Sequence, residues 1–234
     1  MKQCCAAIFG YNEYSKQIHK QIEGSYQNIG LFVISDSEYL EAQSDGMRVE
    51  KFDLSDNWDL IEEHFDVHSL IVFCALNDDA ENVFLTISLR ATFEKLFIIA
   101  LAQDNESMMK MKSAGADKVM PIVQIAANVI SDILGKPIMT QVLHDILYED
   151  GPLTIMEMEI SEQSPINGQY LHDIHFKRDF DLVLLAIVDQ ELGTTFSFAS
   201  KGHNHHIDAG DILVLMGYQE KLNRLKQWND GAKL

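Results

Sequence analysis

The first half of the chain alternates short apolar runs with stretches of helical spacing, and this alternation repeats about six times. Such a pattern is typical of βαβ units, in which helices cover both faces of a parallel sheet. We therefore expect a doubly wound α/β lobe over residues 1–123, with Gly115 as a left-handed residue that ends its last helix. The expected strands are 5–9, 31–34, 48–52, 70–73, 96–100 and 118–122, and the expected helices are 12–23, 38–44, 58–65, 80–91 and 106–114.

Two further helical patterns, 124–134 and 138–149, follow the last of these strands. Apolar residues in the second pattern recur at helical spacing and form one stripe. The stripe needs a cover, which is either the chain's own sheet or a second subunit. The candidate interface residues are Ile130, Leu134, Ile138, Met139, Val142, Leu143 and Ile146.

A Gly-Pro pair at 151–152 ends the helical pattern, and a strand-rich segment follows it. Residues 151–234 predict a small α+β lobe, which would gain stability from docking or dimerisation. Its expected strands are 153–160, 181–188, 194–199 and 211–217, with a short helix at 168–174 and a last helix at 218–228.

The composition is that of a folded globular protein, with 47% hydrophobic residues in a chain of 234. Its longest apolar runs are far shorter than the roughly 20 residues of a membrane-spanning helix. The N-terminus lacks the pattern of a signal peptide, so we expect a soluble protein without direct membrane insertion. A formal net charge of −18 disfavours nucleic acid and anionic membranes as partners. Three cysteines, two of them adjacent, form no disulfide framework and suit a reducing cytosol.

The segment IFGYNEYS (8–15) resembles the start of a dinucleotide-binding loop, because a glycine follows a short apolar strand. Asn12 and Ser15 occupy the second and third glycine positions of that loop. Serine still allows close helix packing, whereas Asn12 puts a side chain where a pyrophosphate would lie. The acid that binds ribose is expected after the second strand, where Ser35 stands and Asp36 follows one residue late. The sequence thus predicts a Rossmann-like fold with weak or absent NAD binding.

Polar residues after the fourth strand belong to the same edge of the predicted sheet. Asn77, Asp78 and Asp79 lie there, and the favoured interpretation is a helix cap with acids at the positive end of the helix dipole. The candidate contacts of a nucleotide such as ATP, ADP or NAD are Gly10, Tyr11, Asn12, Glu13, Tyr14, Ser15, Asp36, Asp53, Asn77 and Asp78.

A histidine-rich segment, KGHNHHIDAGD (201–211), lies in an expected hairpin of the second lobe. His203, His205 and His206 could share a transition metal or sense pH. A loop of solvated histidines is the favoured alternative, because no acid or cysteine completes an obvious site.

These motifs together resemble the RCK (regulator of K+ conductance) domains, also called KTN or TrkA-type domains, of prokaryotic potassium channels and transporters. The resemblance covers nearly the whole chain. In the first lobe it rests on IFGYNEYS, FDLSD, CALNDDAENVFLTISLR and DNESMMKMKSAGADKVMPI, and in the second on PINGQYLHDI, DLVLLAIV and DAGDILVLMGYQEKLNRL. It implies an N-lobe over 1–123, a crossover helix pair over 124–150 that forms a dimer interface, and a TrkA-C-like lobe over 151–234.

The resemblance also bears on ligands. Channel-type members often carry a degenerate loop such as this one, which implies that nucleotide binding became optional. Calcium-gated relatives place three carboxylates where this chain has Ala75, Leu101 and Gln103. We therefore do not expect that calcium site, and a divalent cation elsewhere on so acidic a chain stays open.

The expected function is that of a non-enzymatic, ligand-sensing domain in the gating ring of a potassium channel, in the cytoplasm at the inner face of the cell membrane. Its expected partners are a channel pore domain and copies of itself, which dimerise and assemble into an octameric ring. One alternative is a regulatory subunit of a potassium uptake transporter, which an intact glycine triplet would favour. Another is an NAD(P)-dependent oxidoreductase, which would need a proton-transfer residue that the sequence does not identify.

Overall fold

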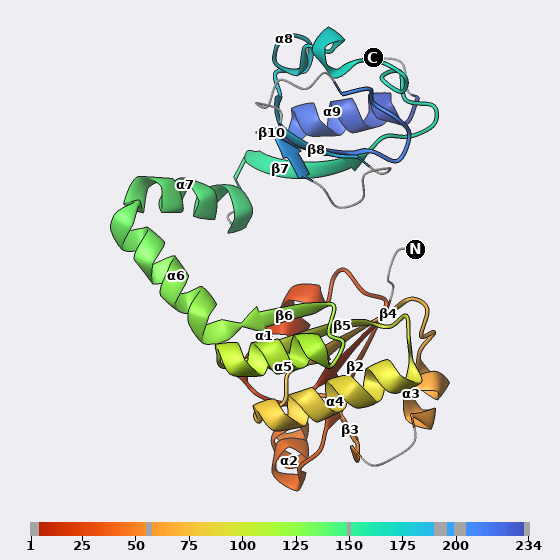
Figure 1. Cartoon of the computed structure of the whole chain (residues 1–234), viewed down its shortest axis with the longest axis vertical. Helices are drawn as coiled ribbons and strands as arrows, with labels where there is room; N and C mark the ends of the chain where they lie inside the picture. Colours follow the sequence, from red (N-terminus) through yellow and green to blue (C-terminus); the bar gives the residue numbers. More distant parts are fainter. Residues whose placement is uncertain (1–4, 55–57, 149–150, 190–195, 199–204, 232–234) are drawn as a thin grey trace. The chain divides into compact units, whose positions relative to one another are not determined.

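Six parallel strands form the sheet of the first half of the chain (Figure 1). The structure is a computed structural model that describes residues 5–54, 58–148, 151–189, 196–198 and 205–231. The strand order is β3-β2-β1-β4-β5-β6. Strands β2 and β3 are added on one side of β1, and β4, β5 and β6 are added on its other side. The strands are β1 (Cys5–Phe9), β2 (Asn28–Val33), β3 (Glu50–Lys51), β4 (Leu70–Cys74), β5 (Phe97–Ala102) and β6 (Lys118–Pro121). The predicted doubly wound fold is confirmed.

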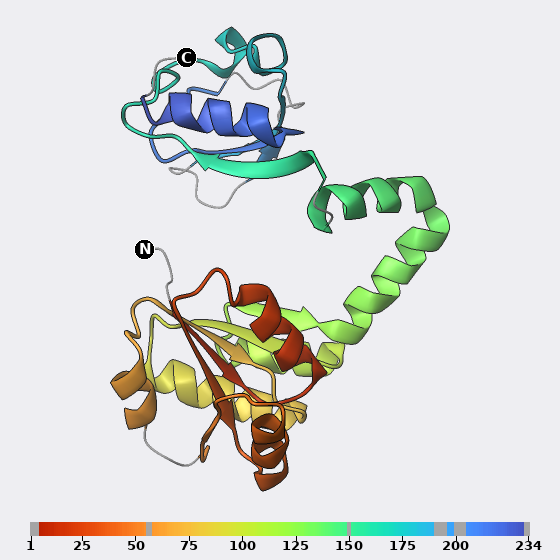
Figure 2. The same ribbon diagram turned by 180° about the vertical axis from the view of Figure 1, so that it is seen from behind.

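Helices cover the two faces of this sheet as right-handed crossovers require. They are α1 (Glu13–Ile22), α2 (Asp36–Ser44), α3 (Asp59–His64), α4 (Asp79–Thr92) and α5 (Asn105–Ser113). The next helix, α6 (Ile122–Gly135), follows β6 and buries none of its residues. Figure 1 shows α4 and α5 in front of the sheet, and Figure 2, from behind, shows α1 and α2. Alternate residues of β1 therefore enter different cores: Phe9 packs in an aromatic cluster with Phe32 and Trp58, and Ile8 packs with Tyr11 on the other face.

Gly115 ends α5 with a φ of +103°, in the left-handed region that the sequence predicted. A Cβ at this position would lie 2.7 Å from the Cγ atom of Arg90. The Arg90 guanidinium donates to the Gly115 carbonyl at 2.9 Å, so the helix end and α4 are joined at this turn.

The chain separates into two compact units, residues 1–131 and 132–234. In the second unit, α7 (Pro137–Tyr148) precedes an antiparallel sheet of order β7-β10-β8-β9. Leu222 and Leu225 of the last helix pack with Leu213 and Leu215 of β10 in the core. The remaining elements are β7 (Leu153–Glu159), β8 (Val183–Val188), β9 (Phe196–Phe198), β10 (Ile212–Tyr218) and α9 (Gln219–Asn229).

One helix prediction in the second unit is wrong. The helix expected at 168–174 is only a 3₁₀ turn, η1 (Leu171–Asp173), and a helix that the sequence did not reveal, α8 (Phe176–Phe180), follows it. Five residues are too few to display a helical period. Asp181 ends α8 in the left-handed region with a φ of 59°, a conformation that aspartate tolerates better than most residues.

No residue of α6 or α7 is buried in the described chain. Leu134 and Ile138 are 79% and 81% exposed, and Ile146 is half-buried. The other candidate interface residues, which are also exposed, are Ile130, Met139, Val142 and Leu143. Among the described residues, the predicted apolar stripe thus has no cover within its own unit. Although these helices are apolar, no helix among the described residues has the length and hydropathy to cross a bilayer.

Candidate functional site

The loop from β1 to α1 passes directly against the end of β4, and Gly10 makes this possible. Its φ is +109°, and a Cβ would lie 2.4 Å from the Ala75 carbonyl oxygen. Since both the backbone conformation and the space exclude a side chain, this position requires glycine. The loop therefore lies at the carboxyl edge of the sheet, beside the point where the strand order reverses.

Asn12 caps α1 with its side chain. Its Oδ1 accepts from the backbone N–H groups of Tyr14 and Ser15 at 3.0 and 3.1 Å. The Ser15 hydroxyl, which is buried, accepts from the Asn12 backbone N–H at 2.8 Å and completes a capping box. The N–H groups of Tyr14 and Ser15 in the first turn of α1 are therefore already hydrogen-bonded within the chain.

The other end of the Asn12 amide reaches across the sheet edge. Its Nδ2 donates to the Ala75 carbonyl at 2.7 Å and to Asn77 Oδ1 at 3.1 Å. Asn77 Nδ2 in turn donates to Glu38 Oε1 at 3.1 Å, and the Ser35 hydroxyl donates to Glu38 Oε2 at 3.0 Å. We call Asn12, Asn77 and Glu38 the amide–carboxylate bridge. It joins the ends of β1, β2 and β4.

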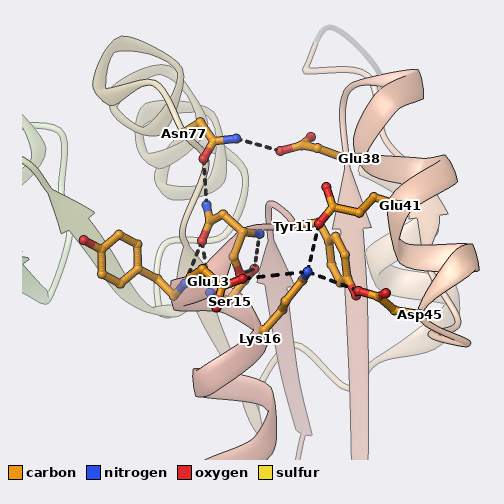
Figure 3. A network of polar contacts seen from close by, with 10 residues as sticks. Tyr11, Glu13, Ser15, Lys16, Glu38, Glu41, Asp45 and Asn77 are labelled. Carbon is orange, nitrogen blue, oxygen red and sulfur yellow. Dashed lines mark hydrogen bonds and ion pairs between the residues drawn. The ribbon is translucent and has the colours of Figure 1, made fainter.

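A second polar cluster fixes α2 to the start of α1 (Figure 3). The Tyr11 hydroxyl donates to Asp45 at 2.6 Å, and Lys16 Nζ lies 2.8 Å from Glu41 and 3.1 Å from Asp45. Burial and the hydrogen bond to Asp45 raise the pKa of Tyr11 to about 12. The hydrogen bonds from Tyr11 and Lys16 lower the pKa of Asp45. Because Ala42 is the one buried residue of α2, these contacts carry much of its attachment.

The remaining predicted contact residues have separate environments. Tyr14 is exposed in the first turn of α1, next to Glu13. Asp36 pairs with Lys51, and Asp53 is exposed after β3.

Asp78 caps α4, since its Oδ1 accepts from the backbone N–H groups of Ala80 and Glu81 at 2.7 and 3.1 Å. The predicted capping role of this residue is confirmed. Partial burial, with the charges of Asp78 and Glu38, raises the pKa of Glu81. The edge of the sheet is therefore strongly acidic around the bridge.

A hollow of about 240 Å³ opens beside Asn12 on the β5 side of the edge. Gln103 is part of its lining. The Gln103 side-chain Nε2 donates to the Asn77 carbonyl at 2.9 Å, and the Gln103 backbone N–H donates to the Asp79 carboxylate at 3.0 Å. Ala75, Leu101 and Gln103, where the resemblance to calcium-gated relatives would require carboxylates, all line this hollow. The lining thus combines amides and one carboxylate with apolar walls, which suits a small ligand bound by hydrogen bonds.

Two residues of the predicted histidine cluster lie in the described chain, and His203 lies outside it. His205 Nε2 is 2.7 Å from Asp211 Oδ2, a carboxylate that is 2% exposed. His206 Nδ1 is 3.1 Å from Asp208 Oδ1. Within the described ranges, no group of three or more His, Cys, Asp or Glu side chains is arranged to hold a metal ion.

Comparisons with known proteins agree with this fold. "Potassium channel protein 1" of Methanocaldococcus jannaschii is 23% identical over 158 residues, which are 68% of this chain and 46% of the relative. The chain thus spans about half the length of this curated relative.

Among solved structures, the GsuK RCK domain covers 99% of this chain and 48% of its own, at 17% identity and a TM-score of 0.50. The human SLO3 gating ring covers 94% of this chain and 46% of its own, at 10% identity and a TM-score of 0.64. At such identities these structures show the fold alone. Residues 6–121 match the family model of the TrkA-N domain. Residues 6–121 therefore form a TrkA-N domain, and the chain is homologous to potassium channel proteins, as its motifs predicted.

Proposed function

We propose that this chain is a cytosolic, ligand-sensing regulatory domain of a potassium channel. The observation that carries the proposal is the homology to a potassium channel protein across 68% of the chain. The RCK-like fold extends over both units and supports the same role. The proposed mechanism is conformational: a ligand that binds one arrangement of the domain better than another shifts the equilibrium between them.

The chemistry of the sheet edge favours sensing over catalysis. Asn12, Asn77 and Gln103 are amides that neither gain nor lose a proton at physiological pH. Asp78 and Asp79 accept hydrogen bonds from backbone N–H groups near the start of α4 and after β5. The edge is therefore suited to hold a ligand rather than to transfer its protons.

We further propose that the chain dimerises through α6 and α7 and that dimers assemble into a ring, octameric in the complete channel. Burying an exposed Leu or Ile side chain fully is worth about 1.5–3 kcal/mol. The stripe on these helices offers several such side chains, among them Leu134, Ile138 and Val142. A two-fold axis lets the same stripe serve both subunits.

The first unit offers an apolar surface that would complement this stripe. A hollow of about 390 Å³ lies on the sheet face that α1 and α2 leave open over β5 and β6. Its lining is apolar and includes Ile18, Phe73, Ile99, Leu101, Met120 and Ile122. We propose that a second copy covers this surface.

The regulatory role is tested by placing this chain in "Potassium channel protein 1" in place of the region that it matches. Potassium flux through the chimera in liposomes is compared with flux through the same channel without the chain. Regulation requires that the chain, or a ligand added to it, changes the flux. Identical flux with and without the chain, in folded and inserted channels, would contradict the proposal.

A further inference from the structure

The start of α1 is where a dinucleotide-binding loop holds phosphate, because helix N-termini present unpaired N–H groups to anions. Here the N–H groups of Tyr14 and Ser15 both donate to Asn12 Oδ1. The oxygen of this amide thus makes the contacts that a phosphate oxygen would make in such a loop.

Asn12 does more than cap the helix. Ser35 and Asp104 also cap helices with a side-chain oxygen, at α2 and α5. Asn12 alone among these three carries an amide whose Nδ2 bonds across the edge, to the Ala75 carbonyl and to Asn77. A phosphate at the loop would have to displace four hydrogen bonds of one side chain.

The charges around the loop also oppose the binding of a phosphate. Glu38 closes the bridge with a carboxylate, and Glu13 follows Asn12 directly. The nearby cations are engaged, since Lys16 lies against Glu41 and Asp45, and Lys51 pairs with Asp36. An incoming phosphate would therefore meet uncompensated negative charge.

We propose that Asn12 determines the ligand specificity of this site: its carboxamide replaces the phosphate group within the loop, so the site selects ligands without a phosphate at this position. The inference rests on the proposed function only in placing the sensed ligand at the sheet edge. It assigns Asn12 a role in binding, and no role in catalysis.

The test compares Asn12→Gly with Asn12→Ser. Glycine is well tolerated at a helix N-cap and frees both N–H groups, whereas serine keeps an oxygen on them. The binding of inorganic pyrophosphate and of ADP is measured by calorimetry at low salt, and the melting temperature of each variant confirms folding. Because charge-assisted hydrogen bonds are strong, we expect Asn12→Gly to bind pyrophosphate about tenfold more tightly than the wild type, or better. Asn12→Ser should bind like the wild type.

A second variant, Asn12→Gly with Glu38→Gln, also removes the carboxylate of the bridge and should bind pyrophosphate more tightly still. The proposal is overturned if both glycine variants fold and neither gains affinity, or if the wild type already binds pyrophosphate as tightly as they do. Such a result would leave the regulatory role intact, since that role is judged by potassium flux in the chimera.

Discussion

Asn77, just beyond β4, donates a hydrogen bond of 3.1 Å to Glu38 in the first turn of α2, across 39 residues of sequence. Because β1 lies between β2 and β4, this contact spans the end of the central strand. It joins the two halves of the doubly wound sheet at the edge where ligands bind in such folds. The Asn77 amide thereby adds a link between α2 and the site to those made by Tyr11 and Lys16.

We expect Asn77→Ala to loosen α2. The substitution removes the donor to Glu38 and one acceptor of Asn12, and α2 has little buried surface to hold it otherwise. A typical hydrogen bond contributes about 0.5–1.5 kcal/mol, so amide exchange over residues 36–44 should quicken by about two- to tenfold. Hydrogen exchange measured by mass spectrometry checks this.

Asn167→Ala is the matched control, because it removes an amide that donates to the Glu162 carbonyl in the second unit. It should leave exchange in α2 unchanged. Equal exchange of α2 in the wild type and in Asn77→Ala would show that the bridge does not position this helix.

The Tyr11–Asp45 contact should make stability depend on alkaline pH. The pKa of Tyr11 is raised from 10.0 to about 12 in the folded chain. A raised pKa means that its stabilisation is complete below pH 10 and is lost as the pH rises from 10 through about 12. Tyr11→Phe should therefore show a smaller fall in melting temperature across this range than the wild type.

Tyr14→Phe serves as the control, since Tyr14 is an exposed tyrosine in the same helix start. It should retain the alkaline dependence of the wild type. If Tyr11→Phe follows the wild-type curve throughout, the hydrogen bond to Asp45 contributes nothing to this dependence.

Gly10→Ala should destabilise the first unit severely. At a φ of +109°, an added Cβ would lie 2.4 Å from the Ala75 carbonyl oxygen, so strain and overlap combine. We expect a loss of about 3 kcal/mol or more in the free energy of unfolding. Gly46 also has a positive φ, +76°, but has nothing within 4 Å of an added Cβ. Gly46→Ala should therefore cost only about 1–2 kcal/mol. Denaturant titration measures the free energy of unfolding of both variants. Equal losses would show that the close approach of Gly10 to Ala75 adds no cost beyond that of the positive φ.

The sequence was sufficient to predict the sheet and most of its helices, because most of these elements carry a hydrophobic period long enough to recognise. The exception, α8, has five residues and takes its conformation from packing, with Phe176 buried in the core of the second unit. Local pattern cannot supply that information.

The candidate site was predictable only where it follows a local motif. Gly10 and Asn12 stand at positions that a known loop assigns, so their importance could be predicted. In the cluster of Lys16, Glu41 and Asp45, the lysine lies 25 or more positions from either carboxylate in the sequence. Charged residues are common on this acidic chain, and only the folded sheet shows which of them meet.

The uncovered stripe of α6 and α7 leads to the prediction with the clearest outcome: the isolated chain forms at least a dimer. Val142 is 50% exposed and Ile146 is half-buried, so both have surface left for a partner to cover. Replacing both with aspartate would place two unpaired charges in the contact, at a cost of several kcal/mol that a dimer should not survive. Aspartates at Gln141 and His144, on the opposite side of α7, add the same charge and should leave the dimer intact. Sedimentation at micromolar concentration distinguishes these cases. A monomeric wild type, or a Val142→Asp/Ile146→Asp variant that stays dimeric, would mean that the stripe does not join subunits, and the proposed ring would lose its structural support.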